Sequence, residues 1–143
     1  MDCPTGPTFS SDYIFGINSE IAKHSQISKL FNTKFERKGG MSVFDFVNTE
    51  STIYVDLKTR RIRHDMYPTS IIGANKVEFA DMDNSKSYHF VYQYEDGLYG
   101  IQYDKELFKT FEIRDFQRGS RSDYDRNSQL CYFIPVNHLR KLA

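Results

Sequence analysis

Two aspartates and a lysine between residues 45 and 58 have the types and the spacing that could hold a divalent cation. Asp45 lies in an apolar run, and Asp56 and Lys58 lie two residues apart in a second run rich in β-branched residues. Residues two apart on a β-strand project from one face, so Asp56 and Lys58 share a face. If the two runs pair antiparallel across the polar break at residues 48–51, Asp45 comes opposite Asp56. Carboxylates side by side are unfavourable unless a cation lies between them, and their hard oxygens suit Mg²⁺ or Mn²⁺.

The lysine has a natural role beside such an ion. An ammonium group near a bound water can orient or help to activate it, and can offset the negative charge of a phosphoryl group under attack. A lone Asp-x-Lys in a strand is more often a solvated ion pair. Three further features favour catalysis here: Asp45 interrupts an apolar strand, Glu20 lies on the inward face of the preceding helix, and basic residues follow at once at Arg60, Arg61 and Arg63.

Glu20 reaches such a site only if a helix turns it toward the core. Residues 18–31 begin with an Asn/Ser cap candidate and carry apolar residues at helical spacing, which predicts an amphipathic helix. Steps of four and three residues from Glu20 reach His24, Ile27 and Phe31, so the acid shares the side that the apolar residues turn inward.

The other three residues need neighbouring strands. The runs at 33–37, 41–47 and 52–62 predict a three-stranded meander. The rest of the chain predicts, in order, a helix over 74–82, a hairpin over 88–103 around Asp96-Gly97, and a final strand over 129–136 leading into a short terminal helix. We therefore expect a mixed α/β chain built on one sheet.

Composition limits the classes of protein. The 143 residues, 39% hydrophobic and 15% aromatic, fit one folded domain over residues 13–143, after a flexible lead over residues 1–12. The two cysteines lie at opposite ends, which excludes a disulfide framework and a zinc knuckle. Without a signal peptide or a long apolar run, we expect an intracellular protein of the cytoplasm or nucleus. Nineteen basic residues balance nineteen acidic ones, so any nucleic-acid partner must be bound by a local cluster.

An acid on a first helix, an aspartate on the second strand and an Asp-x-Lys triplet on the third resemble the PD-(D/E)XK nuclease superfamily. The matching residues are Glu20, Asp45 and Asp56-Leu57-Lys58. The course of residues 67–80 and 88–104 also looks like small viral and phage members, so the resemblance spans about residue 17 to the end. Phe44 stands where the family commonly has Pro, and Asp56 where Glu is commoner.

The resemblance implies a restriction-endonuclease-like fold, a central mixed β-sheet flanked by α-helices, and metal-dependent hydrolysis of phosphodiester bonds in DNA. Asp45, Asp56 and the backbone carbonyl of Leu57 would bind Mg²⁺, for which Mn²⁺ could substitute. Lys58 would position the attacking water. Glu20 would complete the site directly or through a water, and it leaves the site if the helix is rotated. The number of metal ions stays open.

The polyanion would be held by arginines. Strand alternation places Arg60 on the face of Asp56 and Lys58, and places Arg61 and Arg63 on the other face or in the following loop. The loop over 114–127 could follow a nucleic-acid backbone, or could be a solvated loop paired to its own acids; its arginines are Arg114, Arg118, Arg121 and Arg126. Lys76 is expected at the surface. We expect His64, His89 and His138 to have no partner at metal-ligand spacing, and His24 to be a packed or surface histidine and not a general base.

We therefore predict a small Mg²⁺-dependent endonuclease acting on DNA. A homing or restriction-type enzyme, a junction resolvase and a repair nuclease all fit, and a homodimer would provide the two sites that a double-strand cut needs. One alternative is a catalytically inactive nucleic-acid-binding or interaction module of the same fold. A second alternative is a nuclease directed at RNA.

Overall fold

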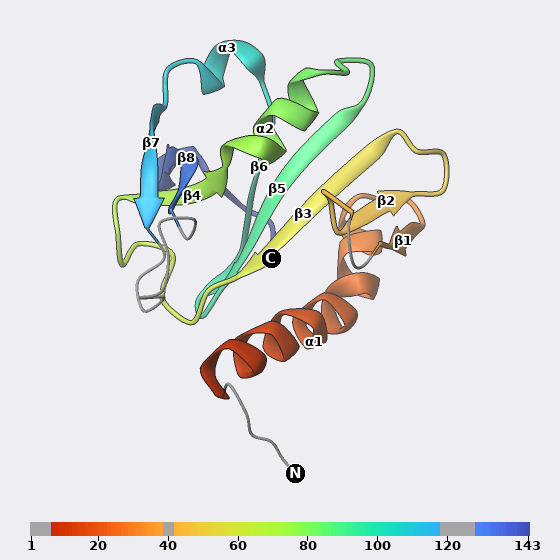
Figure 1. Cartoon of the computed structure of the whole chain (residues 1–143). Coiled ribbons are helices and arrows are strands. Elements are labelled where there is room, and N and C mark those ends of the chain that lie inside the picture. The colour runs from red at the N-terminus through yellow and green to blue at the C-terminus, as the bar shows by residue number, and fades with distance from the viewer. Residues whose placement is uncertain (1–6, 39–41, 118–127) are drawn as a thin grey trace.

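The computed structural model describes residues 7–38, 42–117 and 128–143, and Figure 1 shows how their helices and strands are arranged. The helices are α1 (Pro7–Leu30), α2 (Ala74–Asp81), α3 (Lys105–Phe108) and the short 3-10 helix η2 (Val136–His138). The strands are β1 (Phe35–Arg37), β2 (Phe46–Asn48), β3 (Ile53–Thr59), β4 (Thr69–Gly73), β5 (Ser87–Tyr94), β6 (Gly97–Gln102), β7 (Glu112–Gln117), β8 (Ser128–Pro135) and β9 (Arg140–Lys141).

The larger sheet has the strand order β1-β2-β3-β5-β6-β9. Only β3 and β5 run parallel in it, and the other neighbours are antiparallel. A parallel pair needs a crossover connection, which here consists of β4 and α2. The predicted meander is confirmed as β1, β2 and β3, and the predicted hairpin as β5 and β6, with Tyr94 paired to Gly97 across the turn. The mixed α/β class is thus confirmed.

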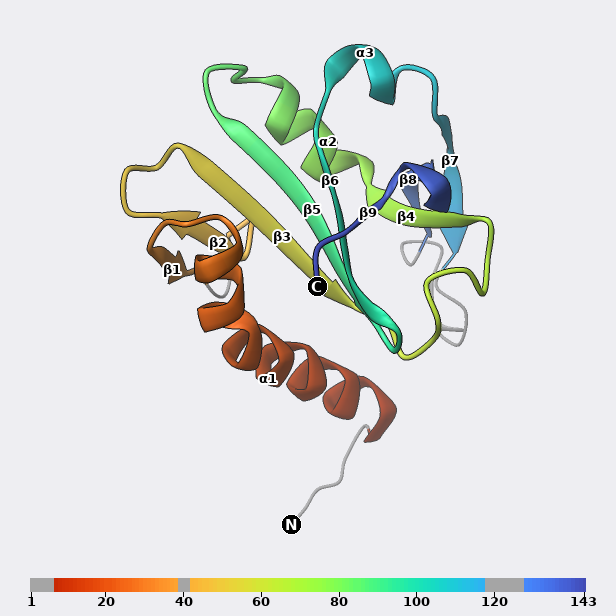
Figure 2. The ribbon, with the colours of Figure 1, turned by 180° about the vertical axis from the view of Figure 1, so that it is seen from behind.

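The two faces of this sheet are covered by different elements (Figure 2). On one face α1 packs through Ile27 against Phe46, Val55 and Leu57, all of them buried. On the other face α2 and α3 pack over a cluster rich in aromatic side chains, which includes Phe90. The alternation of β3 therefore places Asp56 on the aromatic face, in the row that also holds Tyr54 and Lys58.

A second sheet, β4-β8-β7, overturns the expectation of a single sheet. The sequence pattern does not predict strand β4, because its five residues lie between Pro68 and the start of α2. The predicted strand over 129–136 is confirmed as β8, but it is not the last strand. The chain continues through η2 into β9, which pairs with β6 at the edge of the larger sheet.

The first helix also starts earlier than predicted. It begins at Pro7, not near Asn18, so residues 7–12 are helical and do not form a loose lead. Pro7 suits the first turn because its missing N–H would have no partner there. The helix ends at Leu30, close to the predicted position, and in the described part of the chain no helix is long and apolar enough to cross a membrane.

Phe44 fixes the segment that carries Asp45. Its side chain is 1% exposed and contacts the rings of Tyr54, Phe79, Tyr88 and Phe90. We expect Phe44→Ala to lower the free energy of unfolding by about 3–5 kcal/mol, because a cavity replaces a fully packed ring.

Urea denaturation would measure this loss. As a control, Met82→Ala removes a side chain that is 78% exposed, and its effect should stay within about 0.5 kcal/mol. Equal stability of the two variants would contradict the packing role assigned to Phe44.

Candidate active site

The register of β2 and β3 brings two carboxylates together. Phe46 pairs with Val55 and Val47 pairs with Tyr54. One further step in this antiparallel register sets Asp45, the residue before β2, opposite Asp56 in the middle of β3. The two side chains lie close enough for the charge of Asp56 to act strongly on Asp45.

The side chain of Asp45 accepts a hydrogen bond from β3 that a neighbouring strand would otherwise accept. Beyond the end of β2, its Oδ2 accepts a hydrogen bond from the backbone N–H of Leu57 at 2.8 Å. Burial and the charge of Asp56 raise the pKa of Asp45 from 3.8 to about 8, although the Leu57 hydrogen bond opposes the change. At neutral pH Asp45 therefore holds a proton unless a cation takes the proton's place.

Asp56 is a buried acid with one unsatisfied oxygen. It is 1% exposed. Its Oδ1 accepts a hydrogen bond from the Lys76 ammonium at 2.8 Å, and its Oδ2 lies 3.8 Å from the Lys58 ammonium. Among the described residues, Oδ2 is buried without a hydrogen-bond partner. A buried carboxylate oxygen in this state is costly. It can be satisfied by the proton of Asp45 or by a small divalent cation between Asp45 and Asp56, which the donor set fits.

Lys58 is an ammonium group in a partly dehydrated place. Its side chain is 32% exposed. Burial lowers its pKa, the charge of Asp56 opposes this change, and the charge of Lys76 adds to it. A lysine whose pKa is lowered is neutral more often than an ordinary surface lysine, and only the neutral amine can accept a proton.

Lys76 was expected at the surface, and that expectation is wrong. Its side chain is 17% exposed, and its ammonium donates both to Asp56 and to the carbonyl oxygen of Val43 at 2.5 Å. The signal that could have found it is topological. The helix α2 lies in the crossover between β3 and β5, so it must cover one face of β3, and Lys76 is in its first turn.

Glu20 lies beside the pair but is engaged elsewhere. Its Oε1 lies 3.2 Å from Nε of Arg37 on β1, and the two side chains are 18% and 28% exposed. Its charge still contributes to the raised pKa of Asp45. The helix thus turns Glu20 inward, as expected, together with Ile27. His24 packs as expected too, stacking on Phe46 and contacting the carbonyl oxygen of Phe35.

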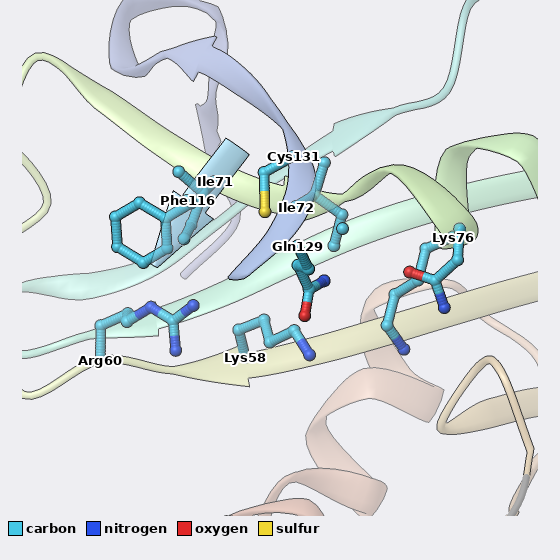
Figure 3. A pocket seen from close by; sticks show the side chains of 10 residues that line it. Lys58, Arg60, Ile71, Ile72, Lys76, Phe116, Gln129 and Cys131 are labelled. Atoms are coloured by element: carbon cyan, nitrogen blue, oxygen red, sulfur yellow. The ribbon is translucent and has the colours of Figure 1, made fainter. Parts of the chain in front are cut away.

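A pocket of about 460 Å³ opens beside the two lysines, and we call it the cationic pocket. Figure 3 shows Arg60, Lys58 and Lys76 in a row along it, with Phe116 and Cys131 on the opposite wall. Within the described part of the chain, its lining holds these three basic side chains and no carboxylate. Arg60 therefore lies on the face that alternation predicts. Such a pocket attracts an anionic group.

The other predicted arginines are placed differently. Arg63 pairs with Asp65 at 3.7 Å and with Asp96 at 3.4 Å, beside the β5–β6 turn. Neither Arg61, which is exposed, nor Arg63 lines the cationic pocket. The predicted contacts Arg118 and Arg121 lie outside the described residues.

A second group of possible metal ligands, one histidine and two aspartates, lies near the β5–β6 turn. One ligand atom each from His64, Asp65 and Asp96 lies within 4.8 Å of the others. The expectation that His64 has no such neighbours is therefore wrong. Arg63 pairs with both Asp65 and Asp96, and His64 Nδ1 lies 2.5 Å from Oδ2 of Asp96. Among the described residues, the group lacks the unsatisfied buried oxygen found at Asp56.

Comparison with known proteins adds no relative. No protein-family model matches the chain, and no curated protein matches it. The function must therefore be argued from the site itself.

The raised pKa of Asp45 makes stability depend on pH. The folded chain keeps a proton that the unfolded chain releases near its ordinary pKa, so the metal-free protein should lose stability as pH rises from about 4 to about 8. Asp45→Asn keeps an acceptor for Leu57 and cannot titrate, so it should remove much of this loss. Urea denaturation at several pH values in a chelator would measure it, and parallel curves for the two proteins would refute the assignment.

Proposed function

We propose that the protein is a metal-dependent endonuclease of the PD-(D/E)XK type that hydrolyses phosphodiester bonds in DNA. One observation carries the proposal. Two carboxylates, Asp45 and Asp56, lie together, and Lys58 lies 3.8 Å from Oδ2 of Asp56, a buried oxygen without a hydrogen-bond partner among the described residues. This is the constellation that the resemblance implies, on a mixed sheet whose helices cover both faces. The restriction-endonuclease-like fold is part of the proposal.

Asp45, Asp56 and the carbonyl oxygen of Leu57 would hold Mg²⁺, with Mn²⁺ as a substitute. When bound, such an ion polarises a phosphoryl oxygen and makes a water more acidic. It would also replace the proton on Asp45, because a divalent charge between the carboxylates removes their repulsion. Glu20 could turn toward the ion only by leaving Arg37.

Lys58 would hold the attacking water and accept its proton, as its lowered pKa allows. The water oxygen bonds to phosphorus while the bond from phosphorus to the leaving sugar oxygen breaks, and that oxygen takes up a proton. The phosphates on either side would lie against Arg60 and Lys76 in the cationic pocket, and these cations would offset the charge that develops on the phosphoryl oxygens. Cutting both strands would need a second site, as in a homodimer.

Nicking of supercoiled plasmid DNA in Mg²⁺ tests the proposal. The wild type should nick, and Asp56→Asn and Lys58→Met should each lower the rate by about 100-fold or more, since each removes a catalytic group. Lys109→Gln is a matched loss of one exposed positive charge, 60% exposed and far along the chain on α3, and it should nick like the wild type.

Identical nicking by all four proteins would end the assignment, because it would come from a contaminant. Structured RNA of matched length at the same salt tests the alternative substrate. Faster cleavage of RNA would make the protein a ribonuclease at the same site.

A second candidate function rests on Lys76. Its ammonium pairs with Asp56 at 2.8 Å. The lysine could therefore replace a metal ion as the positive charge that neutralises this carboxylate. The protein would then be a nucleic-acid-binding module of the same fold without turnover.

Lys76→Met distinguishes the two candidates. Removing one partner of a buried ion pair should lower the free energy of unfolding by about 3–5 kcal/mol in a chelator. If the site binds metal, Mg²⁺ should restore part of this stability by binding the folded state, and Asp56→Asn should abolish the restoration. A variant that Mg²⁺ does not stabilise, in a protein that binds DNA without nicking it, would favour the module.

A further inference from the structure

A second pocket adjoins the cationic pocket and is lined largely by aromatic rings. It encloses about 570 Å³ between the residues after β3, the start of β4, and strands β7 and β8. We call it the aromatic pocket. Its volume falls within the range of about 300–1,000 Å³ that is usual for small-molecule sites. Its walls include Tyr67, Tyr94, Phe116, Phe133, Arg60 and Arg114.

The two pockets are neighbours that share part of their lining. Arg60, Ile71 and Phe116 line both of them. Figure 3 shows Phe116 and Arg60 at the end of the cationic pocket that lies away from Lys76. A polymer whose phosphate lies beside Lys58 therefore reaches the aromatic pocket with its neighbouring unit.

The aromatic pocket offers flat surfaces to a ligand. Tyr67 is 62% exposed and Phe116 is 37% exposed, so both present ring surface to the solvent. The guanidinium of Arg114 lies 3.9 Å from the ring centroid of Phe133, and its Nε also pairs with Glu112 at 2.9 Å. Aromatic rings and guanidinium planes are the groups on which nucleobases stack.

The charge of the lining selects the kind of ligand. Arg60 and Arg114 contribute positive charge, and no carboxylate is among the described residues that line the pocket. An apolar peptide would gain nothing from these arginines, whereas a nucleotide places its base on the rings and its phosphate near Arg60.

We propose that the aromatic pocket receives an unpaired nucleobase of the DNA strand that lies in the cationic pocket, an inference that rests on the proposed function. In an intact duplex both faces of each base are covered by stacking, so a base enters such a pocket only where it is unpaired or flipped out. The substrate class is therefore DNA with unpaired nucleotides next to the cleaved bond. A junction or repair substrate fits this requirement better than an intact duplex.

Binding in a chelator tests the pocket without cleavage. The probes are a short single-stranded DNA carrying one 2-aminopurine and the same strand in a fully paired duplex. The wild type should bind the single strand more tightly than the duplex and should quench its fluorescence by stacking. Phe116→Ala should weaken single-strand binding by about 5- to 150-fold, the range expected for the loss of one stacked base.

Ile113→Ala is the matched control, because Ile113 is on the same strand β7, is 45% exposed, and does not line either pocket. Tyr67→Ala is a second variant, in a loop, that should weaken binding in the same way if Phe116→Ala fails to fold. Unchanged affinity in the folded aromatic variants, or duplex binding as tight as single-strand binding, would overturn the proposal.

The result separates the two hypotheses. Quenching and aromatic-dependent binding in a protein that does not nick plasmid in Mg²⁺ would support the pocket and sink the nuclease. Nicking by a protein whose affinity for the single strand is unchanged by Phe116→Ala and Tyr67→Ala would support the nuclease and overturn the pocket.

Discussion

The register between β2 and β3 is the constraint on which the whole site depends. Phe46 and Val55 are both completely buried against α1, and they face each other across the two strands. A slip of one residue would turn each of these side chains to the other face of the sheet. The apolar pair therefore holds Asp45 opposite Asp56, and packing energy on one face keeps two like charges together on the other. This is why two aspartates persist at positions where Val or Ile would pack with a smaller loss of free energy.

The charges around the pair are balanced only when something fills the space between the carboxylates. Lys76 neutralises one oxygen of Asp56, and Lys58 lies 3.8 Å from the other. Burial and the charge of Asp56 outweigh the hydrogen bond that Asp45 accepts from the Leu57 backbone N–H, so its carboxyl group keeps a proton. A proton or a cation can relieve the same repulsion. Proton release and metal binding therefore both depend on the repulsion between the two carboxylates. If each acid were fully paired with a basic side chain, the site would show neither a raised pKa nor an affinity for a cation.

Local pattern predicted most of the site, and long-range topology decided the rest. Alternation along residues 53–59 placed Asp56 and Lys58 on one face, and the short break at 48–51 fixed the antiparallel partner of Asp45. The position of Lys76 depends on where α2 crosses the sheet, and that follows from the parallel pairing of β3 with β5, which no short stretch of sequence encodes. The pairing of Glu20 with Arg37 likewise joins two elements whose contact arises only in the folded chain. The second sheet was missed because β4 is short and lies between a proline and a helix.

The second sheet also contributes to the site, because β4 and β8 form the wall of the cationic pocket that faces Lys58 and Arg60. Gly73 is where this wall turns into α2. A Cβ atom there would lie 2.5 Å from the amide nitrogen of Gln129 and 2.6 Å from the side-chain oxygen of Asn75, both of which line the cationic pocket. A side chain at position 73 would therefore require these two side chains to shift. The short segment from β4 into α2 carries residues of both regions, because Ile71 lines both pockets and Lys76 donates to Asp56.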